Sequence, residues 1–162
     1  MQTFPTNPNE LKKILPPGKS FCLIGGCFDL IHVGHLHLLK YAATLNDFLV
    51  VAVLSDRYVQ TYKHANRPII NERQRASMVA SIRCVDYVYI ADESPSNHEV
   101  LSLLVPDSIV FGAETGNELR IQQRIEQVRR SSPKTNIRLL PRYEDETIST
   151  GYIIKKIREM TG

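Results

Sequence analysis

The chain has 162 residues, of which 43% are hydrophobic and 23% are charged, a composition typical of one globular domain. A net charge of +3 and a pI near 8.8 fit a site for phosphorylated ligands, and neither requires a nucleic-acid partner. The three cysteines are odd in number and lack Cys-x-x-Cys spacing, so neither a disulfide framework nor a zinc site is indicated. No apolar run has the length of a signal-peptide core or a membrane span, so we expect a cytoplasmic protein without a membrane partner.

The order of apolar and polar segments predicts one α/β domain. Residues 1–19 are polar and proline-rich, and we expect an N-terminal arm with a short helix before a domain at residues 20–162. Five strand-like apolar runs then alternate with helical patterns, at residues 21–24, 48–55, 85–90, 107–113 and 135–141. This alternation predicts a doubly wound five-stranded parallel sheet of Rossmann-like type.

Two segments outside the expected strands bear on function and packing. Residues 56–68 are polar and basic and follow the second strand, where ligands of open α/β sheets bind, so we expect a substrate loop. At the end of the chain, helical spacing predicts a last helix with a buried face formed by Ile153, Ile154, Ile157 and Met160.

The stretch GGCFDLIHVGH, residues 25–35, has the pattern of a phosphate site. Two glycines after a strand let the backbone turn sharply and approach a ligand. A helix begins near Gly34, and its N-terminal N–H groups and dipole favour an anion. His32 and His35 add donors to the same space. Either histidine alone would be read as a solvated or packed residue; their pairing around Gly34 favours phosphate binding.

This stretch contains G-x-F-D-x-x-H-x-G-H and resembles the signature of the nucleotidyltransferases. It most resembles the cytidylyltransferase-like branch, with glycerol-3-phosphate cytidylyltransferase and the heptose-1-phosphate adenylyltransferases, over about residues 20–160. The resemblance implies catalytic roles for His32 and His35. It implies nucleotide binding by Gly25, Gly26, Cys27, Phe28, Asp29 and Gly34. For Asp29, orienting a histidine or a metal-bound water and capping the local turn remain equal alternatives.

A second cluster, LPRYEDETISTG, precedes the last helix. Its hydroxyls are either plain helix caps or ligands of the outer phosphates of a nucleotide. In the family, a stretch of similar sequence binds the nucleotide phosphates. The resemblance therefore implies nucleotide binding by Arg142, Ile148, Ser149 and Thr150. Gly151 departs from the family pattern, which often has a threonine there, and the loop before Ile148 is longer.

Other charged residues are assigned from their positions. The resemblance implies catalytic roles for Lys63, on the loop after the second strand, and for Arg75, on the following helix. Glu114 and Asn117 follow the fourth strand and are weaker candidates for acceptor binding. The basic stripe at residues 120–130 is interpreted as a solvated helix face.

These residues predict transfer of a nucleotidyl group from a nucleoside triphosphate, expected to be CTP, to a small phosphorylated acceptor, with release of pyrophosphate. The acceptor oxygen attacks the α-phosphorus in line, and catalysis is positioning and charge stabilisation. Mg²⁺ is expected with the triphosphate, without a metal site of the protein's own. The resemblance implies a homodimer. Alternatives are an adenylyltransferase that uses ATP and a sugar 1-phosphate such as a heptose phosphate, a non-catalytic nucleotide-binding regulatory module, and, least favoured, an RNA-interacting protein.

Overall fold

The computed structural model describes residues 3–63, 66–112, 118–141, 143 and 148–161. Its strands are β1 (Phe21–Gly26), β2 (Phe48–Leu54), β3 (Tyr87–Ala91), β4 (Ser108–Gly112) and β5 (Asn136–Leu140). Its helices are α1 (Pro8–Ile14), α2 (Val33–Ala42), α3 (Asp56–Gln60), α4 (Glu72–Ala80), α5 (His98–Leu104), α6 (Glu118–Ser131) and α7 (Thr150–Thr161). The expected five strands are therefore confirmed.

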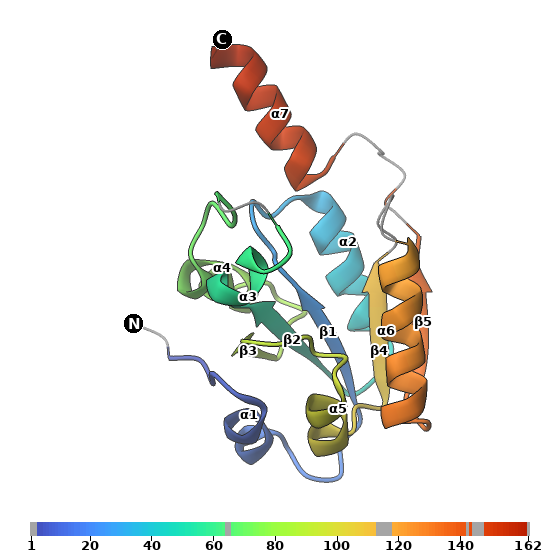
Figure 1. Ribbon diagram of the computed structural model, residues 1–162. Helices are drawn as coiled ribbons and strands as arrows, with labels where there is room; N and C mark the ends of the chain where they lie inside the picture. Colours follow the sequence, from blue (N-terminus) through green and yellow to red (C-terminus); the bar gives the residue numbers. More distant parts are fainter. Residues whose placement is uncertain (1–2, 64–65, 113–117, 142, 144–147, 162) are drawn as a thin grey trace.

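The strands form one parallel sheet in the order β3-β2-β1-β4-β5 (Figure 1). β1 is central and pairs with β2 along its whole length, from Phe21 with Phe48 to Gly26 with Val53. The chain winds from β1 to β3 and then returns to the other side of β1 with β4. In such sheets the ligand crevice lies at the carboxyl ends of the strands where the winding reverses. The predicted doubly wound, single-domain α/β fold is confirmed.

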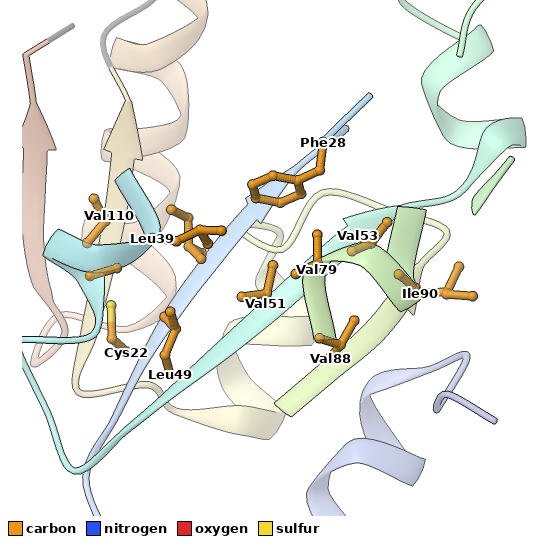
Figure 2. Close-up of a cluster of buried hydrophobic side chains, with 13 residues drawn as sticks. Cys22, Phe28, Leu39, Leu49, Val51, Val53, Val79, Val88, Ile90 and Val110 are labelled. Atoms are coloured by element: carbon orange, nitrogen blue, oxygen red, sulfur yellow. The ribbon is translucent and has the colours of Figure 1, made fainter. Parts of the chain in front are cut away.

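Helices cover both faces of the sheet. One face packs against Leu39 and Ala42 of α2 and Ala76 and Val79 of α4, and Figure 2 shows the resulting cluster around β1 and β2. The other face packs against α1 and α5, and the β4–β5 end of that face packs against α6 through Val128. Every residue of β2 is buried, as an apolar run between two helical layers must be.

The N-terminal segment packs on this core. Leu11 of α1 is fully buried, and the backbone N–H of Ile90 in β3 donates to the carbonyl of Pro5 at 2.8 Å. The short helix expected near residue 11 is present, and it contributes to the same hydrophobic core as the sheet.

The expectation of a buried face on the last helix is wrong. α7 has no buried residue; Ile157 is 52% exposed and Met160 is 78% exposed. α7 extends away from the sheet layers beyond its first turn (Figure 1). Ile153 and Ile154 near its start are half-buried, but the described chain provides no surface that covers Ile157 and Met160.

The expected substrate loop contains a short helix, α3. Ser55 caps it, because its hydroxyl accepts a hydrogen bond from the N–H of Tyr58 at 3.1 Å. Ser55 followed by Asp56 is a sequence signal for a helix start that our interpretation of residues 56–68 as a loop missed. Separately, no helix in the described ranges is long and apolar enough to cross a membrane.

Candidate nucleotide-binding site

A cleft of about 660 Å³ lies at the carboxyl ends of β1, β2, β4 and β5. It is bordered by the loop after β1, the first turns of α2 and α7, the segment after α3, and α6. It brings together most of the site residues predicted from the sequence: Gly25, Gly26, Cys27, Phe28, Asp29, His32, Gly34, His35, Lys63, Ile148, Ser149 and Thr150. The structure also brings His37 and Tyr143 to the cleft, with ring centroids 5.3 Å apart, and the sequence analysis assigned no role to either.

The two glycines that end β1 leave space for other side chains of the protein. A Cβ on Gly25 would collide with the ring of Pro95, and one on Gly26 would lie 2.9 Å from the ring of Phe28. Phe28 is 3% exposed and has a φ of +51°, a backbone conformation costly for a bulky residue. These glycines therefore allow a tightly packed, strained loop that carries Asp29 and the two histidines.

The first turn of α2 holds the histidine pair. His32 is the N-cap of α2, and its Nδ1 accepts a hydrogen bond from the N–H of Gly34 at 3.2 Å. Nδ1 of His35 accepts from the N–H of His32 at 3.4 Å, and the two rings lie 3.9 Å apart. Because both Nδ1 atoms accept, each neutral ring carries its proton on Nε2. Both side chains are thus prepared to donate a hydrogen bond to an anion in the cleft.

His35 is held in its neutral form. Burial lowers the pKa of His35 from 6.5 to about 4, and the charges of His32 and Lys63 act in the same direction, while Asp29 opposes them. At neutral pH His35 therefore donates as an imidazole, without a charge of its own. A bound polyphosphate would supply the negative charge that this position lacks.

Asp29 supports the loop on the far side of the motif. It is 1% exposed, and its carboxylate accepts hydrogen bonds from Nε of Arg67 and from the N–H groups of Ile69 and Ile70, at 3.0 to 3.1 Å. Both carboxylate oxygens are thus engaged by the segment that leads into α4. The sequence left open whether Asp29 orients a histidine or caps the local turn. The hydrogen bonds observed here, to Arg67, Ile69 and Ile70, correspond to neither of these two roles.

Arg75 lies behind the glycine loop. It is 1% exposed, and its guanidinium donates to the carbonyls of Cys27, Leu54 and Ile70 and pairs with Asp56 at 2.6 Å. It does not line the cleft. In this conformation Arg75 joins the ends of β1 and β2 to α4, and it does not point into the cleft as the catalytic role implied by the resemblance would require.

The cations that do line the cleft come from the segment after α3 and from α6. Lys63 is exposed, Arg67 is bound to Asp29, and Arg120 and Arg124 are half-buried. Interpreting the whole stripe at 120–130 as solvated was therefore wrong for two of its members. The missed signal is that Arg124 lies three residues after the packed Ile121, at the border of the apolar stripe, and that Arg120 lies one turn before Arg124.

The first turn of α7 closes the cleft opposite α2. The hydroxyl of Ser149 accepts from the N–H of Tyr152 at 3.0 Å, and that of Thr150 donates to the carbonyl of Asp29 at 2.8 Å. The second bond joins residues 121 positions apart and fixes the two predicted motifs against each other. Ser149 is a helix cap, and it also borders the cleft, so the two sequence interpretations are compatible.

Three predicted residues, Arg142, Glu114 and Asn117, lie outside the described residues. Within the described part, no three His, Cys, Asp or Glu side chains are grouped so as to hold a metal ion. The one carboxylate that borders the cleft there, Asp29, is occupied by hydrogen bonds.

The fold and the cleft define an α/β protein of the doubly wound class, with two helix N-termini at a cleft beside the carboxyl ends of the strands. Residues 23–156 match the model of the cytidylyltransferase-like family. The chain belongs to this family, which confirms the resemblance stated from the sequence.

Individual relatives agree with this membership. The bifunctional protein HldE of Campylobacter jejuni (strain RM1221) is 36% identical over 158 residues, which are 94% of this chain and 31% of the relative. That of Campylobacter fetus is 41% identical over 113 residues, 68% of this chain and 24% of the relative. The chain thus spans less than a third of the length of these curated relatives.

Two solved structures have the same fold. The lipopolysaccharide core biosynthesis protein of Thermoplasma volcanium is 26% identical, with a TM-score of 0.62 over 78% of this chain and all of that chain. The pantothenate synthetase of Thermus thermophilus has a TM-score of 0.64 over 96% of this chain and 70% of its own, at 18% identity, and supports the fold alone.

Proposed function

We propose that the protein transfers a nucleotidyl group from a nucleoside triphosphate to a small phosphorylated acceptor and releases pyrophosphate. The observation that carries this proposal is that two helix N-termini border one cleft, with the neighbouring rings of His32 and His35 at one and with Ser149 and Thr150 at the other. Each N-terminus brings the positive end of a helix dipole to the cleft, and together the two suit a chain of phosphates better than a single anion.

In this mechanism, a phosphate oxygen of the acceptor attacks the α-phosphorus in line, and the bond to pyrophosphate breaks. His32 and His35 donate through Nε2 to the α-phosphate and the departing group, where negative charge is redistributed. Lys63 bridges the reacting phosphates, and the first turn of α7 holds the outer ones. Arg75 acts as a positioning residue, since its contacts hold the glycine loop. No covalent enzyme intermediate is required.

The proposed Mg²⁺ binds with the triphosphate. Because the described residues offer no carboxylate cluster, phosphate oxygens and waters would provide its ligands. Its contribution is to neutralise charge on the phosphates.

The base and the acceptor are finer points of the proposal. CTP is the donor that the phrase LPRYE favours. Similarity to HldE proteins and to a lipopolysaccharide core biosynthesis protein supports a sugar phosphate acceptor, as in the heptose-1-phosphate adenylyltransferases that the sequence resembles, and with it ATP. We therefore propose CTP and ATP as alternative donors and a sugar 1-phosphate as the preferred acceptor.

The deciding experiment is pyrophosphate release from CTP, ATP, GTP and UTP with Mg²⁺, against sugar 1-phosphates, glycerol 3-phosphate and phosphocholine. Acceptor-dependent release with one triphosphate would support the proposal and identify the base. If triphosphate binds and no pair reacts, the regulatory module becomes the better explanation. His35→Ala separates these two functions: an enzyme loses orders of magnitude in rate with little change in triphosphate affinity, whereas a binding module has no rate to lose.

Three expectations about the whole protein stay proposals. We propose a homodimer, as implied by the resemblance, a cytoplasmic location, and a nucleotidyltransferase unit that begins near residue 20. Sedimentation equilibrium tests the first, and a fragment that begins at residue 20 tests the last. Since Leu11 is buried in the shared core, we expect that fragment to be less stable than the full chain.

A further inference from the structure

The basic stripe of α6 contains two kinds of arginine. Arg120 and Arg124 are half-buried and border the cleft, whereas Arg129 and Arg130 near the end of the helix are exposed. Positions 120 and 124 are one turn apart. The apolar contacts that dock α6 on the sheet therefore also hold these two guanidinium groups at the cleft.

Tyr62, which also lines the cleft, contacts Arg120. Cζ of Arg120 lies 4.0 Å from the centroid of the Tyr62 ring, and Nζ of Lys63 lies 5.9 Å from it. The ring is itself packed against Tyr58, with centroids 5.5 Å apart. A guanidinium on an aromatic face keeps its N–H edges available while its plane is fixed, which suits recognition of a phosphate.

The charges around Tyr62 are mostly positive. Among the described residues, no carboxylate lies within 4.0 Å of Lys63 or Arg120, and Asp29 is already paired with Arg67. A hollow of about 460 Å³, lined by Thr61, Tyr62, Lys63 and Arg67, shares the last three residues with the larger cleft, which Arg120 and Arg124 also line. A dianion bound in the cleft beside Tyr62 would meet several cations at once and gain charge-assisted hydrogen bonds.

This basic cluster connects to the histidine pair through Lys63. The charge of Lys63 acts on His35, and those of Arg120 and Arg124 act on Tyr62, the neighbour of Lys63. A transfer between two phosphates needs two anion sites, because the attacking phosphate must be held near a triphosphate that repels it. The two helix N-termini suit the triphosphate. The basic cluster of Lys63, Arg120 and Arg124 around Tyr62 is then the second anion site, for the phosphate of the acceptor.

We propose that Arg120 and Arg124 bind the phosphate of the acceptor, a phosphomonoester dianion such as a sugar 1-phosphate, and that Tyr62 is a positioning residue for Arg120. This inference rests on the proposed function and extends it by assigning the acceptor site, for which the sequence indicated only Glu114 and Asn117.

The first test compares Arg120→Gln and Arg124→Gln with Arg129→Gln, which removes the same charge from an exposed position of the same helix. Each cleft variant is expected to raise KM for the acceptor about tenfold or more, the effect of losing a hydrogen-bonding charged group, with KM for the triphosphate within about twofold. Arg129→Gln is expected to match the wild type. A rise in KM for the triphosphate alone, or no rise in either, overturns the inference.

The second test addresses Tyr62. Tyr62→Phe keeps the aromatic face and should match the wild type, whereas Tyr62→Leu should raise KM for the acceptor about two- to tenfold at unchanged kcat, as expected for a lost cation–π contact. Arg120→Lys keeps the charge without the planar fork and should fall between Arg120→Gln and the wild type. Equal effects of Tyr62→Phe and Tyr62→Leu would exclude the proposed role of the ring.

Binding without turnover separates the inference from the proposed function. Calorimetric titration of the nucleotide-free protein with a hexose 1-phosphate and with inorganic phosphate should give weaker binding for Arg120→Gln than for Arg129→Gln, even if no pair of substrates reacts. Acceptor-dependent release with unchanged binding in Arg120→Gln leaves the function intact and overturns the acceptor site. Absence of binding of either phosphate to the wild type also overturns it.

Discussion

At the scale of single residues, the backbone determines how the two imidazoles are used. Both Nδ1 atoms accept from N–H groups of the first turn of α2, so neither ring can rotate or change tautomer without losing a hydrogen bond. This arrangement disfavours the charged form of His35, because the ring is buried beside a second imidazole and a lysine. Its pKa is lowered to about 4.

This shift predicts a pH dependence of stability. Between pH 6.5 and 4 the unfolded chain binds a proton at residue 35 that the folded chain rejects, so the free energy of unfolding falls as the pH falls through this window. The loss is at most about 3 kcal/mol for a shift of this size. Denaturant unfolding of the wild type and His35→Gln at pH 7 and pH 4.5 measures it, and the variant should lose less stability on acidification.

Exposed His98 on α5 provides the control, because it is remote from the cleft residues in the fold. His98→Gln should have the same pH dependence as the wild type. Equal pH dependence of the wild type and His35→Gln would show that burial does not hold His35 neutral.

Two glycines allow a matched comparison of catalytic geometry. Gly34 and Gly151 are each the second residue of a helix, α2 and α7. A Cβ on Gly34 would lie 3.0 Å from the ring of His32, whereas one on Gly151 would lie 3.8 Å from the nearest atom, the hydroxyl of Ser149. Gly34→Ala should therefore displace His32 and lower kcat about 10- to 100-fold. Steady-state rates of both alanine variants check this, and a larger loss in Gly151→Ala would contradict the role assigned to His32.

At the scale of the element, α7 departs from the family pattern at Gly151 without a steric reason. A side chain there meets only ordinary contacts, and alanine favours the helix over glycine. We expect Gly151→Ala to stabilise the protein by roughly 0.5–1 kcal/mol, measured by thermal or denaturant unfolding. Destabilisation would indicate that residue 151 needs a backbone conformation or a close approach that alanine cannot provide.

The predictions for α6 and α7 were wrong in opposite ways: arginines of α6 were expected to be solvated, and the apolar face of α7 was expected to be buried. On α6 the apolar stripe is packed, and Arg120 and Arg124 follow it into the cleft. On α7 an equally clear stripe contacts the described chain mainly near its start, and Ile157 and Met160 remain exposed. Periodicity indicates which residues share a face, but only a neighbouring surface decides whether that face is buried.

At the scale of the whole molecule, the described lining of the cleft is rich in cations and poor in carboxylates. We therefore expect no Mg²⁺ binding to the nucleotide-free protein, but binding and activity that need Mg²⁺ once triphosphate is present. Calorimetric titration of Mg²⁺ with and without triphosphate, and activity in EDTA restored by Mg²⁺, test this. Stoichiometric Mg²⁺ binding without nucleotide would identify a metal site of the protein itself.

The sequence by itself determined the sheet, the winding and the phosphate motif, because strand-like apolar runs, helix spacing and the pattern around His32 and His35 are local properties of the chain. Gly25 and Gly26 were expected at a sharp turn after the strand and are instead the last two residues of β1, and what fills their space, Pro95 and Phe28, depends on tertiary packing.

Tertiary structure alone decided which charges face the cleft. Arg75 looked like a phosphate ligand and is instead enclosed by Cys27, Leu54 and Asp56, whereas Arg120 looked solvated and lies on Tyr62. The local sequence does not determine where the charged end of a long cationic side chain lies. Its environment depends on the carbonyls, carboxylates and rings that folding brings within its reach.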